Sequence, residues 1–295
     1  GEQGGLSKLS PFTIPSFLVN LAAGQVAIKH QFKGPIGAPV TACAAGVQAI
    51  GDAARMIHSG EADVVICGGA EACIDKVSLG GFAAAKALSA GFLETPELAS
   101  RPFDVDRDGF VMSEGAGMLV IESYDHAIAR GATPLAELVG YGTTSDAYHI
   151  TSGPEDGTGA ARAMQIALRQ AKINPDAIDH INAHATSTQV GDAGELAAIK
   201  RVFEASPTTP AISATKSSTG HLLGAAGGME AIFTIKAIQE QCCPPTINLI
   251  QVDERADGLT IVGKKSLPRN IEYALSNGFG FGGVNASVIF RRFTR

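Results

Sequence analysis

The 295-residue sequence contains no tryptophan, no long hydrophobic run and no run of basic residues. No apolar stretch reaches the roughly 18–20 residues that a membrane-spanning helix needs. The formal net charge of −6 and the lack of a basic cluster argue against a nucleic-acid-binding protein. A small basic patch for an acidic partner is still compatible with this composition.

The five cysteines form no C-x-x-C pair and have no histidine at zinc-binding spacing. Their number is odd and two of them, Cys242 and Cys243, are adjacent, which does not suit a disulfide framework. We therefore expect reduced thiols and a cytoplasmic protein, with the matrix of a mitochondrion or plastid as the alternative.

Strand-like and helix-like segments alternate along the chain. Hydrophobic periodicity predicts helices at 15–31, 44–58, 82–88, 125–130, 159–171, 192–203 and 221–240. Strands are predicted at 38–42, 62–67, 109–122, 135–144, 179–183, 212–214, 259–262, 273–276 and 285–290. The strand at 62–67 is apolar throughout, which predicts burial on both faces. This alternation predicts an α/β protein with a layered sheet, and paired glycines predict close backbone packing.

Cys43 lies where a short β-branched run stops and an alanine-rich helix is predicted to begin. Helix starts favour negative charge, and thiols there often have a pKa of about 3.5–7.5 instead of about 8.5. The position therefore suits a nucleophile with a lowered pKa. The alternative interpretation is a buried cysteine that acts as a small hydrophobic residue.

Three other segments, 182–188, 216–227 and 277–285, place polar residues and glycines at predicted strand ends. They contain His184 and His221, each of which could also be a hydrogen-bonded structural histidine. The Gly-rich segment 277–285 leads into a strand, not a helix, so we reject a dinucleotide-binding loop. At the carboxyl ends of strands in an α/β protein, the cysteine and both histidines would meet in the crevice that binds ligands. A Gly-rich turn there could supply a backbone N–H as an oxyanion donor.

The chain resembles the discrete, elongating β-ketoacyl-acyl-carrier-protein synthases. The matching motifs are TAC43, NAH184ATST, K216SSTGH221LLGAAG, NGFGFGGVN, the segment 100–117 and SDAYH149. The resemblance implies the thiolase fold, a layered α-β-α-β-α sandwich of two similar halves. This chain matches from partway through the first half, so we expect the family's opening strands and helices to lie outside it. Residues 1–131 would carry the nucleophile and residues 132–295 both histidines.

The resemblance also implies a mechanism. Cys43 would take the acyl group from a carrier protein, and malonyl carrier protein would then lose carbon dioxide and extend the acyl chain by two carbons, in fatty acid biosynthesis. His184 and His221 would donate N–H groups to the enolate oxygen. The backbone N–H groups of Cys43 and Phe281 would bind the acyl carbonyl. No cofactor and no metal is expected, because the chemistry runs on thioesters.

Further roles follow from the same resemblance. Lys216 would pair with Glu230 and organise the site, and Phe281 would gate the acyl tunnel. The remaining candidates are the phosphopantetheine ligands Thr186 and Thr188, the pocket residues Phe82 and Phe279 (for the latter, packing is the favoured role), the loop-ordering residues Asp146 and His149, and the carrier-docking residues Lys8 and Lys86. An acidic acyl carrier protein and a second copy of the chain, in a homodimer, are the expected partners.

Several alternatives stay open at this point. A degradative thiolase on coenzyme A would need a further cysteine near the C-terminus, and none follows Cys243. A condensing enzyme of a polyketide or specialised-lipid pathway would use the same motifs. A non-catalytic partner subunit would lack the nucleophile, and an inactive fragment is the last alternative.

Overall fold

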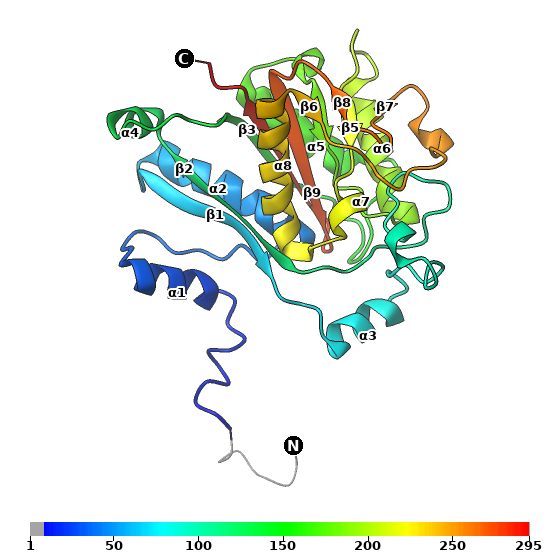
Figure 1. Cartoon of the computed structure of the whole chain (residues 1–295). Helices are drawn as coiled ribbons and strands as arrows, with labels where there is room; N and C mark the ends of the chain where they lie inside the picture. Colours follow the sequence, from blue (N-terminus) through cyan, green and yellow to red (C-terminus); the bar gives the residue numbers. More distant parts are fainter. Residues whose placement is uncertain (1–8, 295) are drawn as a thin grey trace.

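The computed structural model describes residues 9–294, and its centre is a six-stranded mixed sheet (Figure 1). The strand order is β3-β10-β9-β4-β5-β7. Its strands are β3 (Glu137–Ser145), β4 (His180–Asn182), β5 (Ala211–Ser213), β7 (Thr260–Ile261), β9 (Tyr273–Gly280) and β10 (Val284–Arg291). β10 is antiparallel to β3 and β9, whereas β9, β4, β5 and β7 run parallel. The pairing in this sheet is therefore mixed, not purely parallel.

Helices cover both faces of this sheet. α5 (Thr158–Ala171) and α6 (Gln189–Phe203) pack on one face, and α2 (Ala45–Ser59) and α8 (Ala226–Glu240) on the other. A second sheet of two antiparallel strands, β1 (Val64–Glu71) and β2 (Gly115–Glu122), packs on the far side of α2 and α8. The described residues thus form four successive layers, α-β-α-β.

Two apolar cores hold these layers together. The first lies between the six-stranded sheet and the α5–α6 layer and includes Met164, Ile181 and Leu196. The second lies around α2 and α8 and includes Val47 and Val288.

Glycines allow the backbones of the inner layer to touch. A Cβ atom on Gly228 of α8 would lie 2.1 Å from the carbonyl oxygen of Gly117 in β2. A Cβ atom on Gly46 of α2 would lie 2.6 Å from the backbone nitrogen of Gly228. No side chain fits at such distances, so the predicted close packing of glycines is confirmed here.

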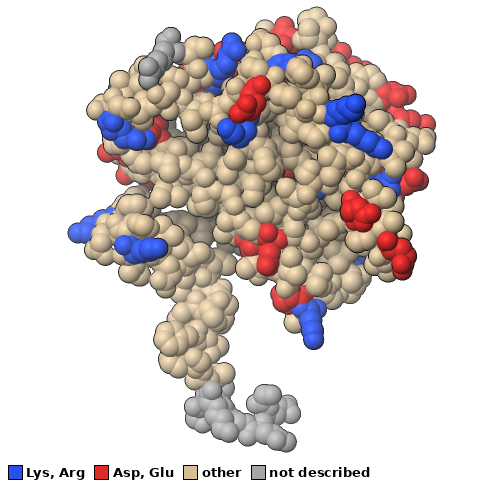
Figure 2. All heavy atoms as spheres, in the orientation of Figure 1, with Lys and Arg blue, Asp and Glu red and all other residues tan. Residues whose placement is uncertain are grey.

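The smaller elements connect these layers. They are α1 (Leu21–His30), α3 (Lys76–Ala84), α4 (Tyr124–Ala129), α7 (Lys216–Thr219), the paired strands β6 (Cys242–Cys243) and β8 (Leu267–Pro268), and several 3-10 turns. In the part of the chain that is described, no helix is both long and apolar enough to cross a membrane. On the face drawn in Figure 2, Lys and Arg side chains are interspersed with Asp and Glu side chains.

Several predicted elements differ from the structure, among them the helices predicted at 15–31 and 82–88, which are α1, beginning at Leu21, and α3, ending at Ala84. Residues 38–42 form no strand, because an extended segment becomes a strand only when a partner strand bonds to it, and β1 pairs with β2 instead. β1 is not buried on both faces: Val64 and Ile66 are 41% and 42% exposed, since none of the described residues covers its outer face. The strand predicted at 109–122 begins at Gly115, and the helix predicted at 221–240 begins at Ala226.

Candidate active site

Cys43 sits in a tight turn that opens helix α2. Residues Ala42–Ala44 form a 3-10 turn (η2), and α2 begins at Ala45. Ala42 has φ 49°, a left-handed backbone conformation that non-glycine residues rarely adopt. Strained residues of this kind cluster at functional sites, and the turn presents the half-buried Cys43 side chain next to two histidines.

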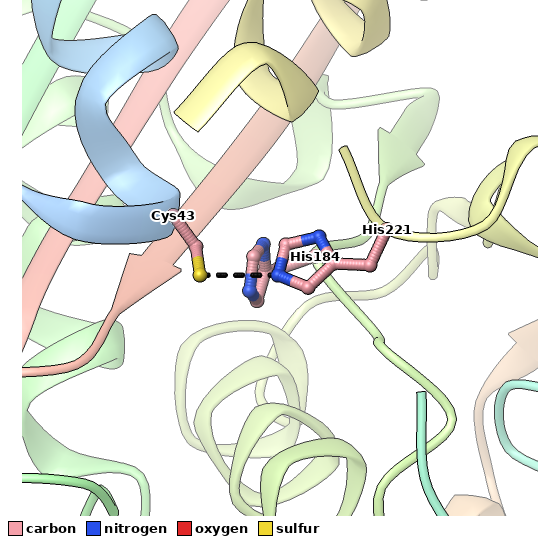
Figure 3. A group of neighbouring side chains, drawn as sticks. All are labelled: Cys43, His184 and His221. Atoms are coloured by element: carbon pink, nitrogen blue, oxygen red, sulfur yellow. Dashed lines mark hydrogen bonds between the residues drawn. The ribbon is translucent and has the colours of Figure 1, made fainter. Parts of the chain in front are cut away.

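His184 and His221 both face Cys43 (Figure 3). The Nε2 atom of His221 lies 3.0 Å from the Cys43 Sγ atom, at hydrogen-bond distance. The two imidazole rings are perpendicular, with centroids 5.3 Å apart and planes at 84°. The convergence that the sequence predicts for these three side chains is present in the structure.

The backbone around His221 is fixed by bonds to the segment that precedes β2. His221 N donates to the carbonyl of Val111 at 2.7 Å, and Ser113 N donates to the carbonyl of His221 at 3.0 Å. Gly220 has φ 69° and Leu223 has φ 47°, so two left-handed residues bracket the histidine. These turns interrupt the helix that the sequence predicts from 221 onward and leave the imidazole free to face the cysteine.

His184 is supported by a buried ion pair. Lys216 Nζ contacts Glu230 Oε1 and lies 3.4 Å from His184 Nδ1. The side chains of Lys216 and Glu230 are 1% and 3% exposed. An ammonium group only donates, so Nδ1 of His184 accepts and the proton of the neutral ring sits on Nε2. That tautomer turns an N–H donor toward the space beside Cys43.

Burial keeps the three central groups uncharged. It lowers the pKa of both His184 and His221 well below the usual 6.5, and the Lys216 charge acts in the same direction. Burial also raises the pKa of the Cys43 thiol to about 11, with the Lys216 charge opposing it. The lowered thiol pKa predicted from a helix start is therefore wrong, because desolvation of the thiolate outweighs the short turn that precedes α2. The resting site holds a neutral thiol beside neutral imidazoles.

The turn between β9 and β10 lies against the Cys43 backbone. A Cβ atom on Gly280 would lie 2.5 Å from the carbonyl oxygen of Thr41 and 3.1 Å from the nitrogen of Cys43. Phe281, the next residue, has a side chain that is 41% exposed. Gly280 thus brings the predicted oxyanion donor segment beside the nucleophile.

Aromatic rings line two sides of the histidines. Phe279 packs 5.7 Å from the His184 ring, and Phe110 packs edge-on against His221 at 5.3 Å. Phe82 stacks edge-on against Phe110 at 5.2 Å, so it belongs to a second row of rings behind His221.

The segment 145–151 holds the Gly-rich turn. Asp146 N donates to the carbonyl of Gly283 at 2.8 Å, and Asn285 Nδ2 donates to Asp146 Oδ1 at 2.7 Å. His149 is exposed and accepts from Thr151 N at 3.2 Å. Asp146 therefore orders the turn that carries Phe281, whereas His149 bonds to Thr151 in its own segment.

The remaining candidates lie farther out. The hydroxyl oxygens of Thr186 and Thr188 are 3.1 Å apart, and Thr188 also caps helix α6 through Gly191 N. Lys86 is exposed on the segment after α3, with φ 55°. Lys8 lies outside the described residues.

Two acidic residues of α6 lie near the site, although neither belongs to one of the motifs that predict it. Glu195 accepts hydrogen bonds from the backbone nitrogens of His184 and Ala185 at 2.9 and 2.7 Å and from Asn277 Nδ2 at 3.0 Å. Asp192 is fully buried and pairs with the Arg107 guanidinium. One sequence signal could have indicated them. The two acidic residues are three apart on the helix face that also carries Leu196 and Ile199, so their carboxylates point toward the core.

The same three side chains could ligate a metal ion. The sulfur of Cys43 and one ring nitrogen each from His184 and His221 lie within 4.8 Å of one another. Thiolate and imidazole are the ligands that Zn²⁺ prefers, so the donor set fits zinc chemically.

Comparisons with known proteins agree with this geometry. The profile described as "Beta-ketoacyl synthase, N-terminal domain" matches residues 1–127, and "Beta-ketoacyl synthase, C-terminal domain" matches residues 135–250. The 3-oxoacyl-[acyl-carrier-protein] synthase 2 of Rhizobium meliloti is 53% identical over 98% of this chain and 68% of its own length. The mitochondrial 3-oxoacyl-[acyl-carrier-protein] synthase of Arabidopsis thaliana is also 53% identical, over 97% of this chain and 62% of its own length. The chain thus spans about two thirds of these relatives.

Solved structures confirm the fold class. A ketosynthase of a type II polyketide system, solved with its acyl-carrier protein and bound to the hexaketide, matches with a TM-score of 0.95 and 37% identity, over 98% of this chain and 71% of its own. A beta-ketoacyl synthase from Burkholderia phymatum matches with a TM-score of 0.89 and 41% identity, over 93% of this chain and 66% of its own. The described layers are therefore those of the expected thiolase-type fold, and the chain belongs to the beta-ketoacyl synthase family.

Proposed function

We propose that this chain carries the active site for decarboxylative condensation of an acyl thioester with malonyl-acyl carrier protein, which lengthens the acyl chain by two carbons in fatty acid biosynthesis. The observation that carries the proposal is the meeting of Cys43, His184 and His221, with the Cys43 sulfur 3.0 Å from a His221 nitrogen. A nucleophile and two N–H donors are the groups that this reaction requires.

In the first half-reaction, the Cys43 sulfur attacks the carbonyl carbon of the acyl thioester. The carbon–sulfur bond to the phosphopantetheine arm breaks, and the acyl group becomes bound to Cys43. The thiol proton passes to the departing pantetheine sulfur, so the carrier leaves as a thiol, while His221 stays neutral with its Nε2–H directed at the Cys43 sulfur. Because the resting thiol is protonated, proton transfer and attack are coupled in this step.

In the second half-reaction, malonyl carrier protein loses carbon dioxide. The electron pair of the broken bond forms an enolate, whose oxygen accepts hydrogen bonds from the N–H groups of His184 and His221. The enolate carbon then attacks the acyl carbon on Cys43, and the N–H groups of Cys43 and Phe281 bind the oxyanion that develops. The Cys43 thiolate leaves and takes up one proton from solvent.

The supporting residues act on these groups. Lys216, held by Glu230, keeps Nδ1 of His184 as an acceptor and thereby keeps its Nε2–H directed at the enolate. Phe281 at the tip of the Gly-rich turn gates the acyl tunnel, and Phe82 and Phe279 lie on its walls. Thr186 and Thr188 bind the phosphopantetheine arm. In this proposal residues 1–131 supply the nucleophile and residues 132–295 both histidines.

The proposed partner is an acidic acyl carrier protein, which Lys86 and Lys8 would meet. In support, a structural relative that is 37% identical is solved in complex with its acyl-carrier protein. We also propose a homodimer in the cytoplasm or, as in the Arabidopsis relative, in mitochondria. The fatty-acid pathway is favoured over a polyketide pathway because the named fatty-acid relatives reach 53% identity, whereas the polyketide ketosynthase reaches 37%.

Intact-protein mass spectrometry after incubation with a medium-chain acyl carrier protein tests the proposal. An acyl adduct is expected on the chain and on the matched control Cys242→Ser, and none on Cys43→Ser. An adduct that persists on Cys43→Ser would overturn the assignment of the nucleophile. No adduct on any of the three proteins would show that this chain does not perform the transfer.

A further inference from the structure

Glu71, the last residue of β1, reaches the segment that carries His221. Its Oε2 atom accepts a hydrogen bond from Gly224 N at 3.1 Å, across 153 residues of sequence. Gly224 lies three residues after His221, in the 3-10 turn Leu223–Ala225 that leads into α8. Glu71 lies outside the sequence motifs that match the family, and it has no role in the proposed mechanism.

The Gly224 residue is held from more than one side. A Cβ atom on Gly69 of β1 would lie 2.4 Å from the Gly224 carbonyl oxygen, and one on Gly46 of α2 would lie 3.1 Å from it. The preceding residue, Leu223, has φ 47°. The segment from His221 to α8 is therefore a strained turn. In it, the Gly224 carbonyl group is fixed by packing and the Gly224 N–H group by the hydrogen bond to Glu71.

Gly224 has both the Glu71 carboxylate and the Cys43 turn as neighbours. A Cβ atom on Gly224 would lie 3.1 Å from Glu71 Oε2, 3.7 Å from the carbonyl oxygen of Ala42 and 3.8 Å from the Cβ atom of Ala45. Gly224 thus lies against the residues that flank Cys43 while its N–H is held by the Glu71 carboxylate. Through Gly224, Glu71 acts on the turn that sets the distance between the Cys43 sulfur and the His221 imidazole.

We propose that Glu71 is a positioning residue, which holds the His221 turn against the Cys43 turn and so maintains the hydrogen bond between Cys43 and His221. The expected effect on kcat rests on the proposed function, whereas the anchoring contact of Glu71 with Gly224 does not. A carboxylate accepting from a backbone N–H makes a stronger hydrogen bond than a neutral acceptor does, which suits an anchor at a strained turn.

A negative charge at this place has a second effect. The Glu71 carboxylate raises the pKa of the Cys43 thiol, as Glu230 does, while Lys216 lowers it. The other groups that face the sulfur, His184 and His221, are neutral near pH 7. Glu71 therefore disfavours a free thiolate before the acyl substrate arrives, and the cysteine reacts more slowly with small electrophiles.

Two variants separate anchoring from charge. Glu71→Gln keeps an acceptor oxygen for Gly224 N and removes the charge, whereas Glu71→Ala removes both. Glu114→Gln is the matched control, because Glu114 bonds Ile74 N at 3.0 Å and acts on the thiol of Cys73 but not on that of Cys43. The readouts are the rate of Cys43 alkylation by iodoacetamide from pH 7 to 10, site-resolved by mass spectrometry, and kcat and KM for decarboxylation of malonyl-acyl carrier protein.

For Glu71→Gln, alkylation at a given pH should accelerate about threefold, because the charge that raises the pKa of the Cys43 thiol is removed, with kcat nearly unchanged. For Glu71→Ala, kcat should fall about tenfold or more at unchanged KM, consistent with loss of one charge-assisted hydrogen bond. Glu114→Gln should match the wild type in both readouts.

Wild-type kcat in Glu71→Ala, or a wild-type alkylation profile in Glu71→Gln, would overturn the corresponding half of the proposal. Should Glu71→Ala not fold, Glu71→Gln still decides through its alkylation profile. A wild-type chain that alkylates normally but never decarboxylates malonyl carrier protein would contradict the proposed function, and the alkylation comparison would still test Glu71.

Discussion

Lys216 and Glu230 form an ion pair in the interior, and the second neighbour of the Lys216 ammonium is Nδ1 of His184, 3.4 Å away. Both side chains are less than 4% exposed, so the two charges are almost completely removed from water. Removing one partner leaves an uncompensated buried charge, which is far more costly than the pair itself is stabilising.

Lys216→Ala should therefore lose both stability and decarboxylation. The free energy of unfolding should fall by about 3–5 kcal/mol, as for other broken buried pairs, and the rate should fall with the loss of the His184 tautomer. Urea denaturation and a malonyl decarboxylation assay measure the two effects. Lys236→Ala is the matched control, because its pair with Glu240 is exposed and its removal should change neither quantity. A stable, active Lys216→Ala would show that the pair does not support the site.

His184→Ala and His221→Ala should each stop malonyl decarboxylation while Cys43 still takes up an acyl group. Losing one oxyanion-type donor typically reduces the rate about 10²–10³-fold. Decarboxylation is followed by release of labelled carbon dioxide and acylation by intact mass. The control is His58→Ala, since His58 is exposed at the end of α2. Condensation at the wild-type rate by either active-site variant would contradict the assigned roles.

Decarboxylation should be almost independent of pH between 6 and 8. The pKa of both His184 and His221 lies well below 6.5, so neither imidazole gains a proton in this range and both stay N–H donors of fixed charge. Initial rates with saturating malonyl carrier protein test this. A rate that falls in acid with an apparent pKa near 6.5 would mean that one of these imidazoles titrates like an exposed histidine and would contradict the prediction.

Buried His180 should make the fold less stable in acid. Its pKa is lowered to about 3 by burial, so below the ordinary value of 6.5 the unfolded chain takes up a proton that the folded chain does not. Its contribution is present above pH 6.5 and is lost as pH falls, by about 2 kcal/mol at pH 5. Comparing urea denaturation at pH 7 and pH 5 for the wild type and His180→Gln should show a smaller loss in the variant. Equal losses would contradict the prediction.

Gly280→Ala should impair acylation of Cys43. The added methyl group would lie 2.5 Å from the Thr41 carbonyl oxygen and 3.1 Å from Cys43 N, so the turn must move away from the nucleophile. Overpacking of this kind typically costs about 1–3 kcal/mol. Gly263→Ala is the control, because nothing lies within 4 Å of a Cβ atom there. Equal acylation rates for the two variants, measured by mass spectrometry, would exclude close contact at Gly280.

Added Zn²⁺ should inhibit the enzyme and protect Cys43 from alkylation. The three donor atoms lie within 4.8 Å of one another, and small shifts would place each of them roughly 2.0–2.3 Å from a zinc ion between them. Binding displaces the thiol proton, so protection should increase as pH rises, and a chelator should reverse it. His184→Ala should lose most of the protection. Unprotected alkylation at saturating Zn²⁺ in the wild type would show that the site does not accept the metal.

Local sequence patterns were sufficient for much of the scaffold. The helices predicted at 44–58 and 159–171 are present as α2 and α5, because their apolar stripes, alanine content and closing Gly60 or Lys172 turn are properties of neighbouring residues. Patterns failed where a partner element decides the outcome. Residues 38–42 have the composition of a strand but no strand beside them, and β1 has the composition of a buried strand but an uncovered outer face.

The site shows the same division. The sequence by itself determined which chemical groups are present, a thiol, two imidazoles and a Gly-rich turn, each in a motif specific enough to indicate the family. Only the tertiary structure decided that Glu195 and Glu71 anchor the backbone around them and that the thiol rests protonated. The reason is physical: desolvation and hydrogen-bond geometry depend on which distant segments enclose a group, and neither is encoded in the residues next to it.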